Sequence, residues 1–398
     1  MIKAGKETIK YINKQNILSF FRKREDVSKA EIAETIGLSP ATVSLLTQEL
    51  VDEGYLVENR YGESSGGRKP MLYNLNRELA YILAVKITPK GAVLAVMNLS
   101  GEIVYHRVLR MQIHDTGSLE KILAEAVGEM RMKNPALAEK ITFAAYSVPG
   151  VLEYENAKIV YSAALFVEEF DLKKITAELM GRELKIYLFK DTDALLLNEY
   201  YEDDKKERNM VFLYCENGVG MSVTNRGKLL RIEGCGLEIG HTTIDIHGAK
   251  CKCSATGCVG TLLGEVPALQ RYEEIRQSLE QGGEFPDITA MSYQSLVERC
   301  LNEADPAAEE VVQEQIKLLS IVTANVVNLF NPGVVVIGGA LTRLTETIPE
   351  VTRHVKETAL KPFTRNLTIQ AARQDRNAAL YGMANYILDR EFFKRLSI

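Results

Sequence analysis

One histidine and three cysteines lie close together in the second half of the chain. His241, Cys251, Cys253 and Cys258 have the spacing H-x9-C-x-C-x4-C, and the whole chain has six cysteines. One imidazole and three thiolates are the ligand set of a closed tetrahedral zinc site. The step from Cys251 to Cys253 is too short for an unstrained disulfide. The sequence therefore predicts one structural zinc ion per chain. His247 is the alternative histidine ligand, and incidental buried cysteines are the alternative to a metal site.

The composition indicates a cytoplasmic protein of two or three domains. The chain has 398 residues, of which 46% are hydrophobic, and this suffices for proper cores. It has no apolar run of membrane-spanning length, and residues 1–15 lack the apolar core of a signal peptide. Because thiols stay reduced in the cytoplasm, a cysteine cluster there indicates a metal rather than a disulfide.

The charge distribution permits a DNA-binding segment at the N-terminus. The net charge of −5 argues against general affinity for nucleic acid. Residues 1–70 nevertheless hold 11 Lys and Arg against 10 Asp and Glu. A specific DNA-binding protein needs only one basic face, so this balance permits DNA binding without proving it.

The first fifty residues have the signals of three helices joined by short turns. Apolar residues at helical spacing predict a helix over residues 13–24. Ser28 is suited to cap a second helix, with Glu31 completing a capping box, and Gly37 is suited to end that helix. Ser39 is then the predicted N-cap of a third helix whose first residue is a proline. Two helices joined by a tight glycine-containing turn predict a helix-turn-helix.

A strand, a polar turn and a returning strand at residues 71–75 follow, and they predict the wing of a winged helix. The N-terminal part of the third helix is expected to enter the major groove of DNA, while the wing lies against the backbone or the minor groove. A winged helix used for protein contacts is the alternative, which the basic wing disfavours. The expected DNA contacts are Ser39, Ala41, Thr42, Ser44 and Gln48 from the helix and Arg68 and Lys69 from the wing.

The remaining residues predict a mixed α/β protein with two lobes. Three apolar strands follow Tyr81, then helices and strands alternate, and a long helix near residues 311–330 precedes the strand VVVIGG. The predicted division is a winged helix-turn-helix at 1–76, a smaller lobe at 77–195 with 375–398, and a larger lobe with the zinc site at 196–374.

Several segments together resemble the ROK family of repressors and sugar kinases. They are LEIGH at 237–241, the cysteine cluster with Ser254 at a glycine position of the family motif, NPGVVVIGGA at 331–340, and the winged helix ending in SSGGRKP. The resemblance covers nearly the whole chain. It implies an N-terminal winged helix-turn-helix followed by a two-lobed, actin-like (ribonuclease H-like) ATPase fold.

The phosphate-binding loops distinguish the kinases from the repressors within this family. The kinase motif D-x-G-G-T corresponds to Lys86–Lys90, which has no glycine, and Pro89 there has no N–H to offer a phosphate. The second loop, G-T-G-I-G-x-G, corresponds to residues 216–222, where Glu216 would repel a triphosphate. No kinase activity is therefore expected.

The resemblance also assigns sugar contacts to Asp191, Glu238 and His241, with His241 using its second ring nitrogen. Lys190 replaces the family's asparagine, and we interpret it as a contact for a phosphorylated or acidic sugar; the alternative is a surface lysine without a contact. The predicted protein is a homodimeric or homotetrameric repressor of sugar-metabolism genes. It binds a double-stranded DNA operator and a sugar or sugar-phosphate effector, without a membrane. A sugar kinase with a fused DNA-binding domain, a regulator controlled by a protein partner and an effector-free regulator are the alternatives.

Overall fold

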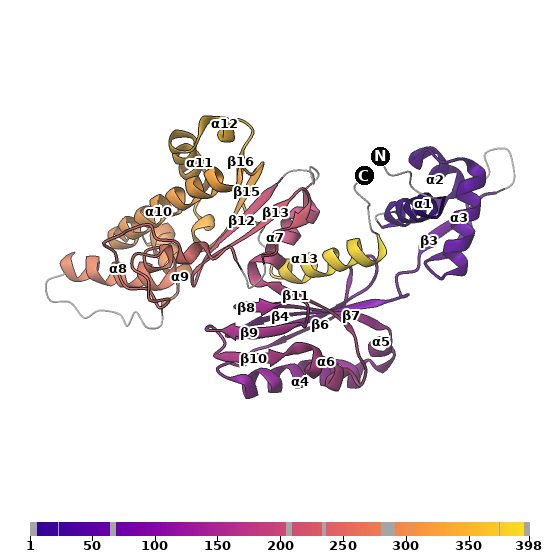
Figure 1. Cartoon of the computed structure of the whole chain (residues 1–398), viewed down its shortest axis with the longest axis horizontal. Helices are drawn as coiled ribbons and strands as arrows, with labels where there is room; N and C mark the ends of the chain where they lie inside the picture. The colour runs from indigo at the N-terminus through magenta and orange to yellow at the C-terminus, as the bar shows by residue number, and fades with distance from the viewer. Residues whose placement is uncertain are drawn as a thin grey trace. The chain divides into compact units, whose positions relative to one another are not determined.

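The computed structural model describes residues 6–22, 24–63, 69–203, 209–232, 236–279, 291–303, 305–373 and 375–393. The chain forms two compact units, which we call the first unit (residues 1–191 and 379–398) and the second unit (residues 192–378). A five-stranded sheet lies at the centre of each unit (Figure 1). The predicted three-part division, with boundaries near 76 and 195, stays a prediction.

Three helices and a small sheet form the N-terminal part of the first unit. The helices are α1 (Lys6–Phe21), α2 (Lys29–Ile36) and α3 (Pro40–Asp52), and the strands are β1 (Val27–Ser28), β2 (Leu56–Tyr61) and β3 (Met71–Leu75) in the order β1-β3-β2. Ser28 accepts the N–H of Glu31, and Gly37 ends α2 in the left-handed conformation (φ 73°), as predicted. Ile17, Leu46 and Leu50 fill the small core and are at most 2% exposed. The chain therefore folds here as a helix-turn-helix with a β2–β3 wing.

The central sheet of the first unit has the order β11-β7-β4-β5-β6. β4 and β5 and β6 form an antiparallel meander, and β4, β7 and β11 run parallel. The bounds are β4 (Tyr81–Thr88), β5 (Gly91–Met97), β6 (Ile103–Leu109), β7 (Ile141–Val148) and β11 (Lys185–Lys190). A second, three-stranded sheet that was not predicted contains β8 (Val151–Glu153), β9 (Lys158–Ser162) and β10 (Val167–Asp171).

Helices cover both faces of this central sheet (Figure 1). On one face lie α4 (Thr116–Lys133) and α6 (Leu172–Met180), and α5 (Pro135–Glu139) follows α4. The hydroxyls of Tyr146 and Thr176 are 2.7 Å apart on that side. On the other face lies α13 (Ala378–Ile387), which continues as a π-helical turn (Leu388–Phe392); its Tyr386 ring meets the Phe189 ring edge-on at 5.2 Å. The last helix of the chain thus belongs to the first unit.

The central sheet of the second unit has the order β14-β13-β12-β15-β16. The bounds are β12 (Met210–Cys215), β13 (Val219–Asn225), β14 (Lys228–Leu229), β15 (Val334–Gly339) and β16 (Thr368–Ala371). The 25-residue helix α10 (Pro306–Phe330) supplies much of the core on one face, and α7 (Asp191–Glu202) packs on the other. The other helices are α8 (Glu265–Leu279), α9 (Tyr293–Asn302), α11 (Thr347–Thr358) and α12 (Lys361–Thr364), with short 3₁₀ turns at Ile239–His241, Val259–Thr261 and Ala340–Arg343.

Both central sheets have one topology. In each, the first three strands form an antiparallel meander, and the fourth and fifth strands add parallel to the first. This repeated five-stranded sheet is the actin-like architecture predicted from the sequence. Among the described residues, every helix is too short or too polar to cross a membrane.

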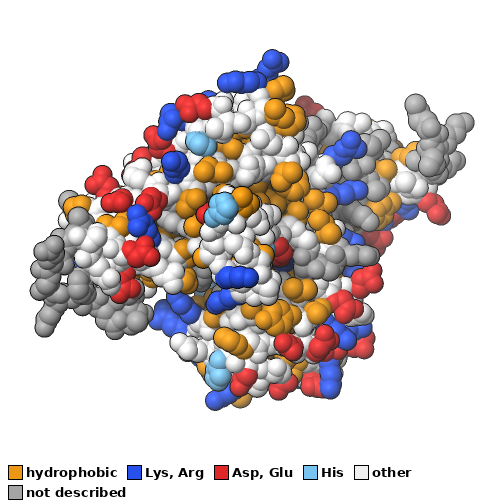
Figure 2. All heavy atoms as spheres, turned by 60° about the vertical axis from the view of Figure 1, so that its left-hand side comes forward, with side chains coloured by type: hydrophobic (Ala, Val, Ile, Leu, Met, Phe, Trp, Pro, Cys, Tyr) orange, Lys and Arg blue, Asp and Glu red, His pale blue; other side chains and the backbone are white. Residues whose placement is uncertain are grey.

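Acidic and basic side chains are interspersed over the described part of the face drawn in Figure 2. A large single-sign field would be needed for sequence-independent binding to nucleic acid. This face instead carries the mixed charges expected of an ordinary protein surface.

Candidate metal centre and DNA-binding surface

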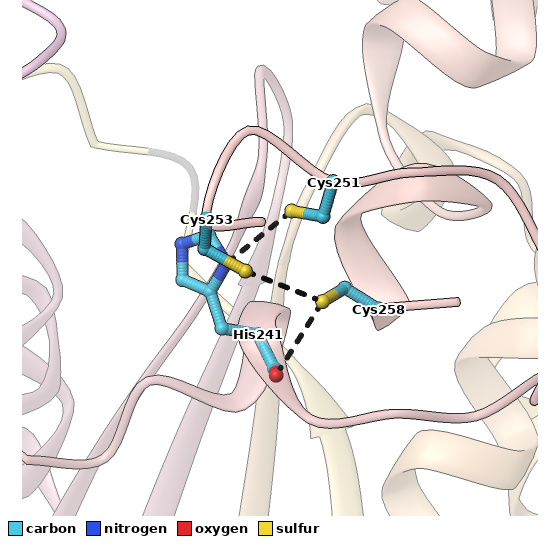
Figure 3. A group of neighbouring side chains, drawn as sticks. All are labelled: His241, Cys251, Cys253 and Cys258. Atoms are coloured by element: carbon cyan, nitrogen blue, oxygen red, sulfur yellow. Dashed lines mark hydrogen bonds between the residues drawn. The ribbon is translucent and has the colours of Figure 1, made fainter. Parts of the chain in front are cut away.

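The four predicted metal ligands come together in the second unit (Figure 3). The ligand atoms of His241, Cys251, Cys253 and Cys258 all lie within 4.8 Å of one another. Cys253 Sγ is 3.6 Å from Cys258 Sγ, and Cys251 Sγ is 3.6 Å from His241 Nδ1. With Zn–S bonds of about 2.3 Å, the edge of a tetrahedron is about 3.8 Å. The four side chains could therefore hold a tetrahedral metal ion, and the histidine in this group is His241 rather than His247.

The backbone brings the cysteines to this point by two tight turns. The N–H of Cys251 donates to the carbonyl of Ala255 at 2.8 Å, which closes the loop between the first two cysteines and the third. Ser254, at the glycine position of the family motif, has φ 75°, so a serine here adopts the left-handed conformation that glycine favours. Gly257 has φ 68°, and a Cβ there would lie 1.5 Å from the carbonyl oxygen of Asp245.

The histidine faces the sulfurs with Nδ1, which leaves Nε2 on the other edge of the ring. His241 is exposed, whereas Cys258 is buried. The Ala255 N–H lowers the pKa of the Cys253 thiol to about 7, which favours the thiolate that binds metal. Glu238 is the N-cap residue of the 3₁₀ turn Ile239–His241, and it is also exposed.

The third helix of the winged domain begins as predicted. Ser39 Oγ accepts the Thr42 N–H at 3.2 Å, and the two hydroxyls are 2.8 Å apart, so both side chains help to cap α3. Ala41, Ser44 and Gln48 are exposed on one face at positions i, i+3 and i+7. These three predicted DNA contacts therefore share the exposed face of α3.

Other side chains also lie on or beside the exposed face of α3. Lys29, at the start of α2, donates to Ser44 Oγ at 3.4 Å, and Gln48 Nε2 donates to Asp52 at 2.9 Å. Leu45 is 59% exposed between the polar residues. Lys29 therefore lies beside the exposed face of α3, although it was not among the residues predicted there. Lys69 is exposed at the base of the wing, and Arg68 lies outside the described residues.

The ROK family model matches residues 82–390, and a model of winged helix-turn-helix DNA-binding domains matches residues 12–57. The chain belongs to the ROK family. The chain is 27% identical over 391 residues to a xylose repressor of Caldicellulosiruptor bescii, covering 96% of each chain. It is 23% identical over 384 residues to the transcriptional dual regulator NagC of Escherichia coli, covering 95% of this chain and 93% of NagC.

Solved structures of ROK proteins share the fold. A ROK family transcriptional regulator described as a homologue of the E. coli MLC protein superposes with a TM-score of 0.78 at 22% identity, covering 96% of both chains. A ROK hexokinase from Thermus thermophilus superposes with a TM-score of 0.59 at 22% identity, covering 76% of this chain and 96% of the hexokinase. The match to the regulator therefore includes the winged helix as well as the ROK fold.

The first of the ROK phosphate-loop positions is a tight hairpin turn in this chain. Thr88 pairs with Gly91 across β4 and β5, so only Pro89 and Lys90 form the turn. The Thr88 hydroxyl donates to the Gly91 carbonyl at 3.1 Å, and the carbonyl of Pro89 accepts the Ile113 N–H at 2.9 Å. The turn has few backbone N–H groups to direct at an anion.

At the second phosphate-loop position, the Glu216 carboxylate accepts a hydrogen bond from a backbone N–H group. The N–H of Ala340, at the start of the 3₁₀ turn after β15, donates to Glu216 Oε2 at 2.8 Å. Gly339 just before it has φ 114°, and a Cβ there would lie 1.8 Å from the Cys215 carbonyl oxygen. Nearby, Gln315 Oε1 accepts both the Gly264 N–H and the Tyr293 hydroxyl. Side chains therefore accept the Ala340 and Gly264 N–H groups.

The four predicted sugar contacts lie at two places in the sequence. Lys190 ends β11 and Asp191 begins α7, in the first unit. Glu238 and His241 share the 3₁₀ turn described above, in the second unit. Their role in binding a sugar stays a prediction.

Proposed function

We propose that this chain is a DNA-binding transcriptional repressor of sugar-metabolism genes whose affinity for its operator is set by a sugar effector. The observation that carries the proposal is the match to a xylose repressor over 96% of both chains, which includes the winged helix as well as the ROK domain. NagC supports the same function at 95% coverage of this chain. The capped α3 with its exposed polar face supplies a helix of the kind that enters the major groove.

The DNA contacts in this proposal come from α3 and the wing. Gln48 is suited to bidentate bonds with adenine, and Ser44 accepts or donates to either base edge. Ser39 and Thr42 contact phosphates through the helix start, Ala41 fits against a thymine methyl, and Lys69 and Arg68 hold the backbone or the minor groove. A homodimer or homotetramer would present two such winged helices to two half-sites of the operator, about one helical turn apart.

The effector and the metal act together in this proposal. Asp191, Glu238 and His241 bind sugar hydroxyls, and Lys190, next to Asp191 in the sequence, is the fourth proposed sugar contact. A zinc ion held by Cys251, Cys253, Cys258 and His241 Nδ1 fixes the orientation of the imidazole and so its free Nε2. The ion is structural, since four protein ligands leave no open position. The effector changes DNA affinity only by binding one of two states of the repressor better than the other.

The chain is not expected to transfer phosphoryl groups, although a ROK hexokinase shares its fold. Transfer from ATP depends on positioned donors and cations around the phosphates. Here the Pro89–Lys90 turn and the Glu216–Ala340 hydrogen bond leave few such donors. Mg-ATP is expected to leave the thermal midpoint unchanged; saturable stabilisation with hexose phosphorylation would favour the kinase. A regulator relieved by a protein partner is supported if no sugar shifts the midpoint.

Selection of duplexes from a random library, followed by titration of the selected operator, tests the proposal. Gln48→Ala is expected to weaken specific binding about tenfold and to relax one position of the site, since a good bidentate pair contributes about 1–3 kcal/mol. Gln294→Ala, on α9 of the second unit, is the matched control and should bind as the wild type does. Enrichment of no sequence by the wild-type protein would refute the proposal.

A further inference from the structure

Three side chains form a row across the carboxyl ends of the parallel strands in the first unit. Lys86 of β4 pairs in register with Ser147 of β7, and Ser147 pairs with Phe189 of β11. Residues paired in register point to the same face of a sheet. Phe189 contacts Tyr386 of α13 at 5.2 Å, so this is the face that α13 covers. The row ends next to Asp191, where the chain leaves β11 and begins α7.

The hydroxyl in the middle of this row is unsatisfied. Ser147 is 0% exposed, and its Oγ has no hydrogen-bond partner among the described residues. Leaving a buried hydroxyl unpaired costs about 1–3 kcal/mol, so such groups need an explanation. A hydroxyl in a structural role would be expected to bond to a neighbouring carbonyl, as the buried Ser320 does with Ile316.

Burial of the neighbouring Lys86 ammonium also costs free energy. Burial lowers the pKa of the Lys86 ammonium, and the Asp191 carboxylate acts in the opposite direction. An alkyl side chain would fill the same place without desolvating a charge. Lys86 stands where the resemblance to kinase members places the aspartate of D-x-G-G-T, so the charge at this position is reversed. A lysine and a hydroxyl side by side are two donors that one anion can satisfy.

The location agrees with this interpretation. In α/β sheets, ligands bind outside the carboxyl ends of parallel strands. β4, β7 and β11 all end at this edge, and Asp191, a proposed sugar contact, adjoins it. Lysine is a common phosphate ligand, and charge-assisted bonds to phosphate are roughly twice as strong as neutral ones.

We propose that Lys86 and Ser147 form an anion site that holds the phosphate of a phosphorylated sugar, whose hydroxyls are bound by Asp191. The proposal rests on the sugar-regulated function for the identity of the ligand, but not for the presence of the anion site. It assigns the phosphate to Lys86 rather than to Lys190, which pairs with Val148 and therefore projects from the opposite face of the sheet.

Titration calorimetry and phosphorus NMR on the full chain test the site. The probes are inorganic phosphate and three sugar pairs: glucose, N-acetylglucosamine and xylose, each with its terminal phosphate ester. One ester is expected to bind at least tenfold more tightly than its neutral parent. Inorganic phosphate is expected to bind weakly and to compete with that ester. Binding of inorganic phosphate without preference for any ester would overturn the sugar-phosphate assignment and leave a plain anion site.

The variants assign the binding to the two residues. Lys86→Met should abolish phosphate binding and reduce the ester to the affinity of its parent. Ser147→Ala should weaken the ester about fivefold and, because it removes an unpaired hydroxyl, should leave the protein folded. Lys90→Met, on the exposed turn after β4, is the matched control and should change nothing. Equal phosphate affinity in the wild type and in both Lys86→Met and Ser147→Ala would refute the site.

The same proteins separate this inference from the proposed function. Titration of the selected operator measures DNA binding without any effector. Loss of operator preference with Lys86-dependent phosphate binding intact would refute the repressor and retain the anion site. Operator binding without Lys86-dependent phosphate binding would refute the anion site and retain the repressor.

Discussion

Removal of the metal is expected to destabilise the second unit strongly. The segment from His241 to Cys258 holds all four ligands, yet only Gly257 and Cys258 in it are buried. It has isolated bridges, such as the one between Lys250 and Thr256, instead of strands. Segments with so little buried apolar surface open at low cost unless something else holds them. A metal ion held by the four ligands would therefore add a strong constraint to this segment.

The size of the effect follows from linkage. At free zinc about 1,000 times the dissociation constant, binding stabilises the folded state by about 4.1 kcal/mol. For a unit of about 150–250 residues, each kcal/mol shifts the thermal midpoint by about 2–4 °C. The second unit, residues 192–378, falls in that range. Chelation is therefore expected to lower its midpoint by about 8–16 °C.

Elemental analysis and scanning calorimetry test this expectation on one preparation. The purified chain should carry one zinc ion, a strong chelator should remove it and lower the midpoint, and added zinc should restore both. Cys253→Ser should behave as the chelated protein does. Cys300→Ser, a cysteine of α9 outside the cluster, should retain metal and midpoint. A metal-free protein with an unchanged midpoint would show that the ion does not hold this segment.

Three further changes test the packing of the two units. Ser39→Ala removes the cap of α3 and should cost about 1 kcal/mol, seen as faster amide exchange in that helix. Leu50→Ala, at 1% exposure, should cost about 2–5 kcal/mol and abolish operator binding, whereas Leu45→Ala, at 59% exposure, should leave the melting of the domain unchanged. Gly339→Ala should lower the yield of folded protein, because its Cβ would collide with a backbone carbonyl, whereas Gly218→Ala, with nothing within 4 Å, is the control.

Local signals were sufficient for the caps and the metal ligands. Ser28, Gly37 and Ser39 were predicted in their observed roles because a cap depends on residues within one turn. The start of α1 was placed seven residues too late, at Asn13 instead of Lys6. Its first turns have little apolar periodicity, and Lys10 gains a partner only in the folded protein, where it pairs with Glu49 of α3 at 2.6 Å.

Long-range contacts were beyond the sequence patterns. α9 buries Tyr293, Leu296 and Val297 completely against the core around α10, and no local pattern in the sequence indicates that contact. The small β8–β10 sheet was missed because its strands have only three to five residues each. The hydrogen bond between Glu216 and Ala340 joins residues 124 positions apart, and no local rule predicts it.

The two altered phosphate-loop positions are equivalent in the repeated topology. One follows the first strand of the central sheet in the first unit (β4), and the other follows the first strand of the central sheet in the second unit (β12). They differ from the kinase motifs in different ways. Pro89 has no backbone N–H group to donate, whereas Glu216 accepts the N–H group of Ala340. Either change alone weakens phosphate binding. Reversing only one of them should therefore leave the chain without affinity for a nucleotide triphosphate. Glu216→Gly is therefore expected to free the Ala340 N–H without creating affinity for Mg-ATP, as measured by thermal shift. Stabilisation of that variant by Mg-ATP would show that the β4–β5 turn is not limiting.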